Sequence, residues 1–199
     1  MPAPVVYYVR HGETDWNVEW RLQGGRDIAL NERGREQANR CGEILRDLMT
    51  RDNRAPDTLD YVSSPLGRAR VTMELVRGRL GLPAEGYRVE QNLTEISFGE
   101  WEGFTIEELS RRDNESVLRR DKDKWNFLPP GGESYQQVMV RIAGWYATLA
   151  RDAVVVAHGG TARALLAHLG IFDPATAAME SIEQGVVYLI AEGKLARYA

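Results

Sequence analysis

The sequence predicts an α/β fold, a three-layer α/β/α sandwich with a mostly parallel central sheet. Short apolar strands alternate with amphipathic helices along the chain, and two of the strands end in a histidine followed by glycine. Such alternation is typical of parallel sheets covered by helices on both faces. The length of 199 residues and the hydrophobic content of 43% suit one domain, which we expect over residues 1–199.

The first half of the chain gives two strands and two helices. Val5–Val9 is an apolar, β-branched and aromatic run that predicts a buried strand ending at Arg10. Helical spacing follows from Asn31 to Met49, with Asn31 as the N-cap. Leu59–Ser63 predicts the second strand, and Ser64-Pro65 then predicts an N-cap and a proline at the first helical position.

The second half begins with a strand expected at Tyr87–Gln91. The alternation of strands and helices is then lost between about residues 93 and 132, which we interpret as a small helical cap insertion. Capping-box patterns at Thr105 and Ser134 predict a short helix inside the cap and a long helix after it. Further strands are expected at Val154–Ala157, Val186–Ile190 and Leu195–Tyr198, with a helix after His158-Gly159-Gly160-Thr161.

Charge and apolar patterning exclude several classes of partner. The 25 Lys and Arg residues are outnumbered by 29 Asp and Glu residues, which argues against a nucleic-acid partner. No apolar run approaches the roughly 20 residues that span a bilayer, and the start Met1-Pro2-Ala3-Pro4 lacks the regions of a signal peptide. The single cysteine, Cys41, forms no internal disulfide. We therefore expect a cytoplasmic protein without a membrane partner.

Both histidine-glycine segments fall where the ligands of open α/β sheets gather, outside the carboxyl ends of the strands. Backbone N–H groups at the start of the following helix, including that of Gly159, favour an anion, and glycine allows close approach. Arg10 and Arg68 add guanidinium groups suited to bidentate phosphate contacts. The sequence thus predicts a pocket for a dianionic phosphoryl group that includes His11 and His158.

A pocket with two arginines and one protonated imidazole could replace the metal ions that other phosphoryl-transfer enzymes use. A second, neutral imidazole could then attack phosphorus. Neighbouring guanidinium charges disfavour a further positive charge, which would keep the attacking histidine neutral. Glu95, after the strand expected at Tyr87–Gln91, is the candidate that protonates the leaving alcohol and then activates water.

These residues lie in segments that resemble the histidine phosphatase superfamily, the phosphoglycerate mutase-like group, over roughly residues 5 to 165. The resemblance rests on five segments in order: Arg10-His11-Gly12-Glu13-Thr14-Asp15-Trp16-Asn17 with Gln23-Gly24, Asp27 and Leu30; Ser63-Ser64-Pro65-Leu66-Gly67-Arg68-Ala69 with Thr72; Leu93-Thr94-Glu95 with Gly99, Trp101, Glu102 and Gly103; Pro130-Gly131-Gly132-Glu133-Ser134; and Val156-Ala157-His158-Gly159-Gly160.

The resemblance implies that His11 becomes a phosphohistidine and that Arg10, Arg68 and His158 bind the phosphoryl group. It further implies that Asn17 adds a phosphate contact, that Glu95 is the acid/base, and that Gln23 and Gly24 line the substrate pocket. The expected activity is a metal-independent phosphomonoesterase that acts on a small phosphorylated metabolite and needs no cofactor.

Two alternatives stay open. Mutases of the family share the opening motif, but they carry a longer insertion after the acid motif and generally Asn where this chain has Gly160. The compact middle segment therefore favours hydrolysis. The second alternative is a phospho-ligand sensor without turnover, which loss of His11 or Glu95 would favour, yet both are present.

Other phosphatase chemistries fit the sequence poorly. Cys41 lies on the apolar side of a helix, as a buried structural thiol does. Asp57 and Asp60 precede a strand and are interpreted as turn residues, whereas aspartyl-phosphate enzymes place paired aspartates after a strand. A zinc or manganese site from both histidines with Glu13 and Glu95 would face repulsion from the adjacent arginines.

The cap and two tryptophans leave specificity undecided. The mixed-charge stretch of the cap is either a solvated surface or, with Phe104, Trp125 or Phe127, a roof that selects the alcohol part of the substrate. Trp16 and Trp20 either pack the loop after His11 or wall the substrate site. His168, on a helix, is expected to be structural. The natural substrate and the oligomeric state are open, and a homodimer is compatible with the sequence.

Overall fold

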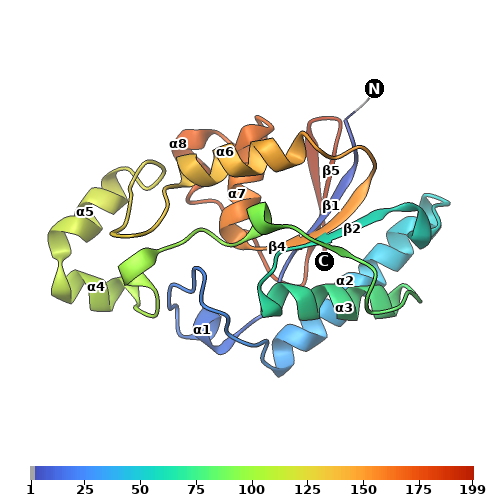
Figure 1. Ribbon diagram of the computed structural model, residues 1–199, viewed down its shortest axis with the longest axis horizontal. Helices are drawn as coiled ribbons and strands as arrows, with labels where there is room; N and C mark the ends of the chain where they lie inside the picture. Colours follow the sequence, from blue (N-terminus) through green and yellow to red (C-terminus); the bar gives the residue numbers. More distant parts are fainter. Residues whose placement is uncertain (1–2) are drawn as a thin grey trace.

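The central sheet has six strands in the order β3-β2-β4-β1-β5-β6 (Figure 1). The computed structural model describes residues 3–199, so Met1 and Pro2, used above for the signal-peptide expectation, lie outside the described residues. The strands are β1 (Val6–Arg10), β2 (Asp60–Ser63), β3 (Arg88–Val89), β4 (Ala153–Ala157), β5 (Val187–Ala191) and β6 (Lys194–Tyr198). The strands β3, β2, β4 and β1 are parallel to one another, whereas β5 pairs antiparallel with β1 and β6 pairs antiparallel with β5. The predicted mostly parallel sheet is confirmed.

Helices cover both faces of this sheet. They are α1 (Asp15–Val18), α2 (Glu32–Arg51), α3 (Gly67–Arg79), α4 (Ile106–Arg112), α5 (Asn114–Lys122), α6 (Tyr135–Tyr146), α7 (Gly159–His168) and α8 (Pro174–Ala177), with 3₁₀ turns at Pro56–Thr58, Gln91–Leu93 and Gly99–Trp101. In Figure 1, α2 and α3 lie on one face and α6 and α7 on the other. The predicted three-layer α/β/α sandwich is confirmed.

The alternation of strand side chains divides the core between the two faces. In β1, Tyr7 and Val9 pack with the apolar sides of α2 and α3, whereas Val6 and Tyr8 pack with those of α6 and α7. All five residues of β4 are buried, as expected for a strand covered on both faces. The buried centre of the sheet therefore includes the two strands whose ends carry the histidines.

The predicted capping residues begin their helices as expected in three cases. Asn31 caps α2 by accepting a hydrogen bond from the Gly34 N–H at 2.8 Å. Thr105 and Ser134 each form a capping box, at the start of α4 and α6 respectively. The cap segment holds α4 and α5, which extend to the left of the sheet in Figure 1 around a small apolar cluster of their own.

The start of α3 differs from the prediction. Ser64 and Pro65 do not open the helix, which begins at Gly67 and receives no side-chain hydrogen bond from its N-cap, Leu66. Asp27 takes that role from outside the helix, because its carboxylate accepts the Gly67 N–H at 2.8 Å and the Arg68 N–H at 3.4 Å. A distant carboxylate therefore supplies the cap that the local sequence seemed to contain.

The strand predicted at Tyr87–Gln91 is also shorter, since only Arg88 and Val89 pair with β2 and a 3₁₀ turn follows at Gln91–Leu93. Glu95 thus follows a turn rather than a strand end. Among residues 3–199, no helix is long and apolar enough to cross a membrane.

Candidate active site

The site lies where the loops after β1, β2 and β4 meet. The ladder between β1 and β4 continues one step past the strands, since the His11 N–H donates to the Ala157 carbonyl at 2.9 Å. On the other side of β4, the Ser64 N–H donates to the Val156 carbonyl at 2.9 Å. These backbone bonds bring His11 and His158 together, with ring centroids 5.1 Å apart and a tilt of 58° between the planes.

The geometry of His11 selects one tautomer. Its Nδ1 lies 2.7 Å from the Gly12 carbonyl oxygen, which only accepts hydrogen bonds, so Nδ1 carries the proton and Nε2 keeps a free lone pair. The ring is buried, and burial, helped by the charges of Arg68 and Arg10, lowers the pKa of His11 well below its ordinary value. The free protein thus holds His11 as a neutral imidazole.

The glycine after His11 serves the packing of the loop. A Cβ atom at Gly12 would lie 2.0 Å from the Gly34 carbonyl oxygen, and one at Gly34 would lie 2.1 Å from the Glu13 carbonyl oxygen. The loop therefore rests backbone against backbone on the first turn of α2. This contact is a use of Gly12 distinct from the predicted close approach to phosphate.

His158 forms hydrogen bonds with residues in or directly after the two strands on either side of β4. Its Nε2 lies 2.7 Å from the Ser64 hydroxyl, and the Tyr8 hydroxyl donates to its carbonyl at 2.8 Å. Its Nδ1 is buried without a hydrogen-bond partner among the described residues. Burial, then the charges of Arg68, His11 and Arg10, lower the pKa of His158 well below its ordinary value.

The lowered pKa values favour neutral forms of both rings in the free protein, so the one protonated imidazole expected from the sequence would need a bound anion. A bound dianion would act in the opposite direction and favour a proton on the pair.

Arg10 and Arg68 are held by backbone carbonyls instead of carboxylates. Arg10 Nη1 donates to the Ile182 carbonyl at 2.7 Å, and Arg68 donates to the carbonyls of Gly24, at 2.9 Å, and Arg26. Neither arginine forms an ion pair within residues 3–199, and the Nε atom of each is buried without a partner. Two buried cations with free donors form a site that favours an anion.

Gln23 and Gly24, expected to line the substrate pocket, are not among the residues that line the cavity beside Arg10. Gly24 adopts a left-handed backbone with φ of 52°, and a Cβ there would lie 2.0 Å from Oε1 of Glu102. Its carbonyl orients Arg68, which is a supporting contact. Gln23 is buried, and its Oε1 has no hydrogen-bond partner in the described part of the chain.

Asn17 is oriented by a residue that the sequence did not suggest. Its Oδ1 accepts hydrogen bonds from the Thr14 N–H at 3.1 Å and from Gln184 Nε2 at 2.9 Å. Because the carbonyl end is used, the amide Nδ2 is the group left for an anion in the adjoining cavity. No local pattern marks Gln184, since its partner lies far away in the sequence.

Glu95 approaches the histidines from the first residues of the cap segment. Its carboxylate accepts the N–H of Gly160 at 3.0 Å and that of Ile96 at 2.9 Å. Gly160 leaves room for this carboxylate, because a Cβ atom there would lie 2.4 Å from Oε1 of Glu95.

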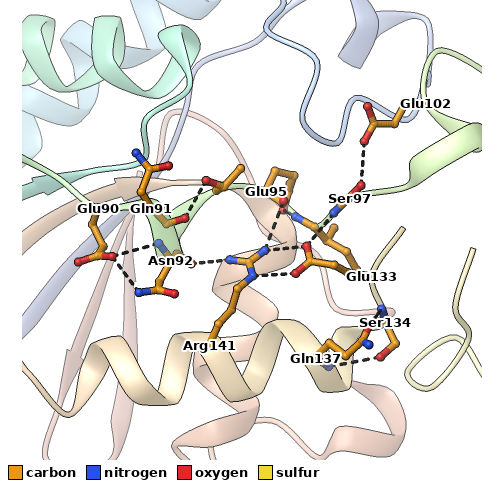
Figure 2. Close-up of polar contacts among 12 residues, drawn as sticks. Glu90, Gln91, Asn92, Glu95, Ser97, Glu102, Glu133, Ser134, Gln137 and Arg141 are labelled. Carbon is orange, nitrogen blue, oxygen red and sulfur yellow. Dashed lines mark hydrogen bonds and ion pairs between the residues drawn. The ribbon is translucent and has the colours of Figure 1, made fainter. Parts of the chain in front are cut away.

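Figure 2 shows how α6 holds the segment that carries Glu95. Arg141 donates to the carbonyls of Asn92 and, at 3.4 Å, Glu95, while its Nε pairs with Glu133 Oε1 at 2.9 Å. The other oxygen of Glu133 accepts the Ser97 N–H at 3.0 Å. Arg141 and Glu133 thus fix the backbone on both sides of the carboxylate, a role that sequence spacing did not reveal.

A cavity of about 930 Å³ has Arg10 and Asn17 in its wall, together with Ile96, the neighbour of Glu95. Trp16 and Trp20 both line this cavity, so the structure favours their role as a wall. Of the residues predicted to form a roof, the aromatic Phe127 and the charged Arg120 and Lys124 line it. Phe104 packs under the guanidinium of Arg112 and Trp125 stacks on Tyr135.

Cys41 lies buried on α2 with its pKa raised to about 12, mainly by burial, as expected of a structural thiol. Within residues 3–199, no group of three or more His, Cys, Asp or Glu side chains is arranged to hold a metal ion.

Comparison with known proteins places these features in a family. The profile of the histidine phosphatase superfamily (branch 1) matches residues 6–191. The chain is 30% identical to 2,3-bisphosphoglycerate-dependent phosphoglycerate mutase 2 of Gloeobacter violaceus, over 83% of this chain and 75% of that protein. It is 33% identical to the uncharacterized phosphatase PhoE of Bacillus subtilis, over 85% and 79% of the two chains.

Among solved structures, the mycobacterial glucosyl-3-phosphoglycerate phosphatase superposes with a TM-score of 0.78 at 30% identity, covering 94% of this chain and 89% of that one. The profile match extends from β1 into β5 and so takes in every strand that carries a site residue. The chain therefore belongs to the histidine phosphatase superfamily, branch 1.

Proposed function

We propose that this protein is a phosphomonoester hydrolase that transfers the phosphoryl group of a small phosphorylated metabolite to His11 and then to water. The observation that supports this most directly is the state of His11. Its Nδ1 proton is held by the Gly12 carbonyl, so the Nε2 lone pair is available beside two buried arginines without carboxylate partners. A neutral nucleophile next to an anion site is what phosphoryl transfer to histidine requires.

In the first step, His11 Nε2 attacks phosphorus while the bond to the alcohol oxygen breaks. Arg10, Arg68 and His158, together with the Nδ2 of Asn17 and the backbone of Gly159, bind the phosphoryl oxygens and stabilise the charge that develops on them. Gln23 and Gly24 support this site, the latter through Arg68. Glu95, in its protonated form, gives the alcohol oxygen a proton as the alcohol leaves.

In the second step, the Glu95 carboxylate takes a proton from water as the water oxygen attacks phosphorus. The bond to His11 Nε2 breaks, which returns the imidazole to its neutral form and releases inorganic phosphate. Every charge that these steps need comes from side chains, so we propose metal-independent catalysis without a cofactor.

Hydrolysis is favoured over phosphotransfer to a second metabolite by the region around Glu95. Gly160 gives the carboxylate its space, and the cap of residues 93–132 is compact. Because the relatives include a phosphoglycerate mutase, mutase activity is the alternative to measure.

A panel of phosphorylated metabolites, assayed for released phosphate with and without a chelator, tests the proposal. We expect release from at least one small phosphomonoester at a rate that the chelator leaves unchanged. The same assay with phosphoglycerates and a bisphosphate primer would reveal isomer exchange without phosphate release if the protein were a mutase. Binding without any turnover would instead favour a phospho-ligand sensor.

A further inference from the structure

The cavity that Arg10 and Asn17 line also has a cationic wall that the proposed chemistry does not use. Arg120 and Lys124 come from the cap and Arg163 from α7, and all three line the cavity. Lys124 and Arg163 have no carboxylate partner among residues 3–199, while Arg120 pairs with Asp121, whose side chain is 55% exposed. The Nε of Arg163 donates to the Glu180 carbonyl at 2.7 Å, a contact that leaves its charge uncompensated.

The carboxylates of the same cavity are already neutralised. Each forms an ion pair with an arginine: Glu13 with Arg33, Glu19 with Arg21, Glu107 with Arg111, and Glu133 with Arg141. The charge that remains free in the cavity is therefore positive, which favours an anionic ligand group.

The cationic wall continues directly into the phosphoryl site. A Cβ atom at Gly159 would lie 3.4 Å from Arg163 Nη1 and 3.6 Å from Arg10 Nε, so the two guanidinium groups flank the same glycine. Arg163 Nη1 also donates to the Tyr135 hydroxyl at 3.2 Å. A ligand held by Arg10 through its phosphate could therefore extend along Arg163 without leaving the cavity.

The cap end of the wall is anchored by aromatic stacking. Trp125, the residue after Lys124, stacks on Tyr135 with centroids 5.5 Å apart and an angle of 16°. Its indole N–H donates to Gln136 at 3.0 Å. Burial, then the charges of Arg120 and Arg163, lower the pKa of Lys124 to about 8, which a nearby anion would reverse.

We propose that Arg120, Lys124 and Arg163 form a subsite for a second anionic group on the alcohol part of the substrate. This inference rests on the proposed function, because it extends the same phosphoryl site. The substrate class that fits is a phosphomonoester with a carboxylate or a second phosphate away from the reacting phosphate. Such a group would complete the charge pairing that Lys124 and Arg163 lack.

Binding of matched ligand pairs to the His11→Ala variant tests the subsite without turnover. The pairs are 3-phosphoglycerate with glycerol 1-phosphate, and 6-phosphogluconate with sorbitol 6-phosphate, each differing only in a carboxylate against a CH₂OH group. Calorimetry should show that the carboxylate member of at least one pair binds about tenfold more tightly. The two pairs differ in the number of carbon atoms between phosphate and carboxylate. The pair whose length matches the distance from the phosphoryl site to the subsite should show the preference.

In the variant Lys124→Met, the ratio of the two dissociation constants within that pair should fall toward one. Arg163→Gln should have the same effect. Lys122→Met is the matched control at the last residue of α5, two positions before Lys124, because Lys122 is exposed and does not line the cavity. The control should keep the preference. Competition of the same ligands with p-nitrophenyl phosphate hydrolysis by the unaltered protein provides a second measurement should His11→Ala fold poorly.

Equal binding within both pairs would overturn the subsite, as would a preference that survives Lys124→Met and Arg163→Gln. Hydrolysis of p-nitrophenyl phosphate, which has no second anionic group, reports on the proposed function separately. Hydrolysis without a carboxylate preference would reject the subsite alone, and a carboxylate preference without hydrolysis would reject the phosphatase activity alone.

Discussion

His11 and His158 face one another across the site with ring centroids 5.1 Å apart, and the pKa of each is lowered by burial and by the same two arginines. Two neutral imidazoles at this distance give the site one nucleophile and one hydrogen-bonding partner for the phosphoryl group.

Folding stability should fall on the acid side of neutrality. In the unfolded chain both histidines bind protons near pH 6.5, whereas in the folded protein their lowered pKa values keep them neutral. The free energy of unfolding should therefore decrease as the pH falls below about 6.5, with each histidine contributing up to about 1.4 kcal/mol per pH unit.

Urea denaturation between about pH 5 and 8 measures this slope. His158→Gln removes one of the two titrating groups, so unfolding of the variant should take up as much as one proton fewer. The slope of its unfolding free energy against pH should be smaller accordingly. Identical slopes in the two proteins would show that His158 binds protons equally in the folded and unfolded states.

Glu95→Gln should slow hydrolysis of an alkyl phosphate far more than that of p-nitrophenyl phosphate. A poor leaving group needs the proton that Glu95 donates, and general acid catalysis contributes roughly 10²- to 10⁴-fold. Steady-state kcat/KM for both substrates gives the comparison, with Glu100→Gln, an exposed neighbour, as the control. Equal losses for the two substrates would contradict the assignment.

Gly160→Ala should reduce turnover through displacement of Glu95. The added Cβ would lie 2.4 Å from Glu95 Oε1 and 2.6 Å from Ile96 Cγ2, so the carboxylate must move. Gly144→Ala is the matched control in helix α6, where a Cβ meets nothing within 4 Å and should stabilise the protein by roughly 1 kcal/mol. Unchanged hydrolysis of an alkyl phosphate by Gly160→Ala would show that the position of Glu95 matters little.

Asp27→Ala should lower stability and weaken phosphate binding together. The carboxylate caps α3 at Gly67 and Arg68, and loss of a cap costs about 1 kcal/mol. Because Arg68 is the second residue of that helix, its guanidinium should shift and KM should rise. Thermal denaturation and substrate titration measure the two effects, with the exposed Asp47→Ala as the control. A loss of stability with unchanged KM would limit Asp27 to a structural role.

The sequence predicted the features of the site that depend on local patterns. The buried runs that form β1 and β4 place Arg10, His11 and His158 at strand ends, and helical spacing places Arg68 in the first turn of α3. The helix start at Ser64 was wrong because that hydroxyl turns to His158 and a distant Asp27 caps the helix instead.

Residues that act across long sequence separations gave no such signal. Gln184 orients Asn17 from 167 positions away, and Arg141 holds the Glu95 segment from helix α6. The hydrogen bonds they form depend on how the layers pack, so only the folded structure identifies their partners.

The location of the phosphoryl group after brief reaction with substrate tests the central role of His11 most directly. The protein is mixed with p-nitrophenyl phosphate, quenched in base, digested and mapped by mass spectrometry, with His11→Ala treated in parallel. We expect a base-stable, acid-labile phosphoryl group on the peptide that contains His11, no label in His11→Ala, and hydrolysis by that variant lower by about 10³-fold or more. A phosphoryl group on any other residue, or full hydrolysis by His11→Ala, would contradict the mechanism.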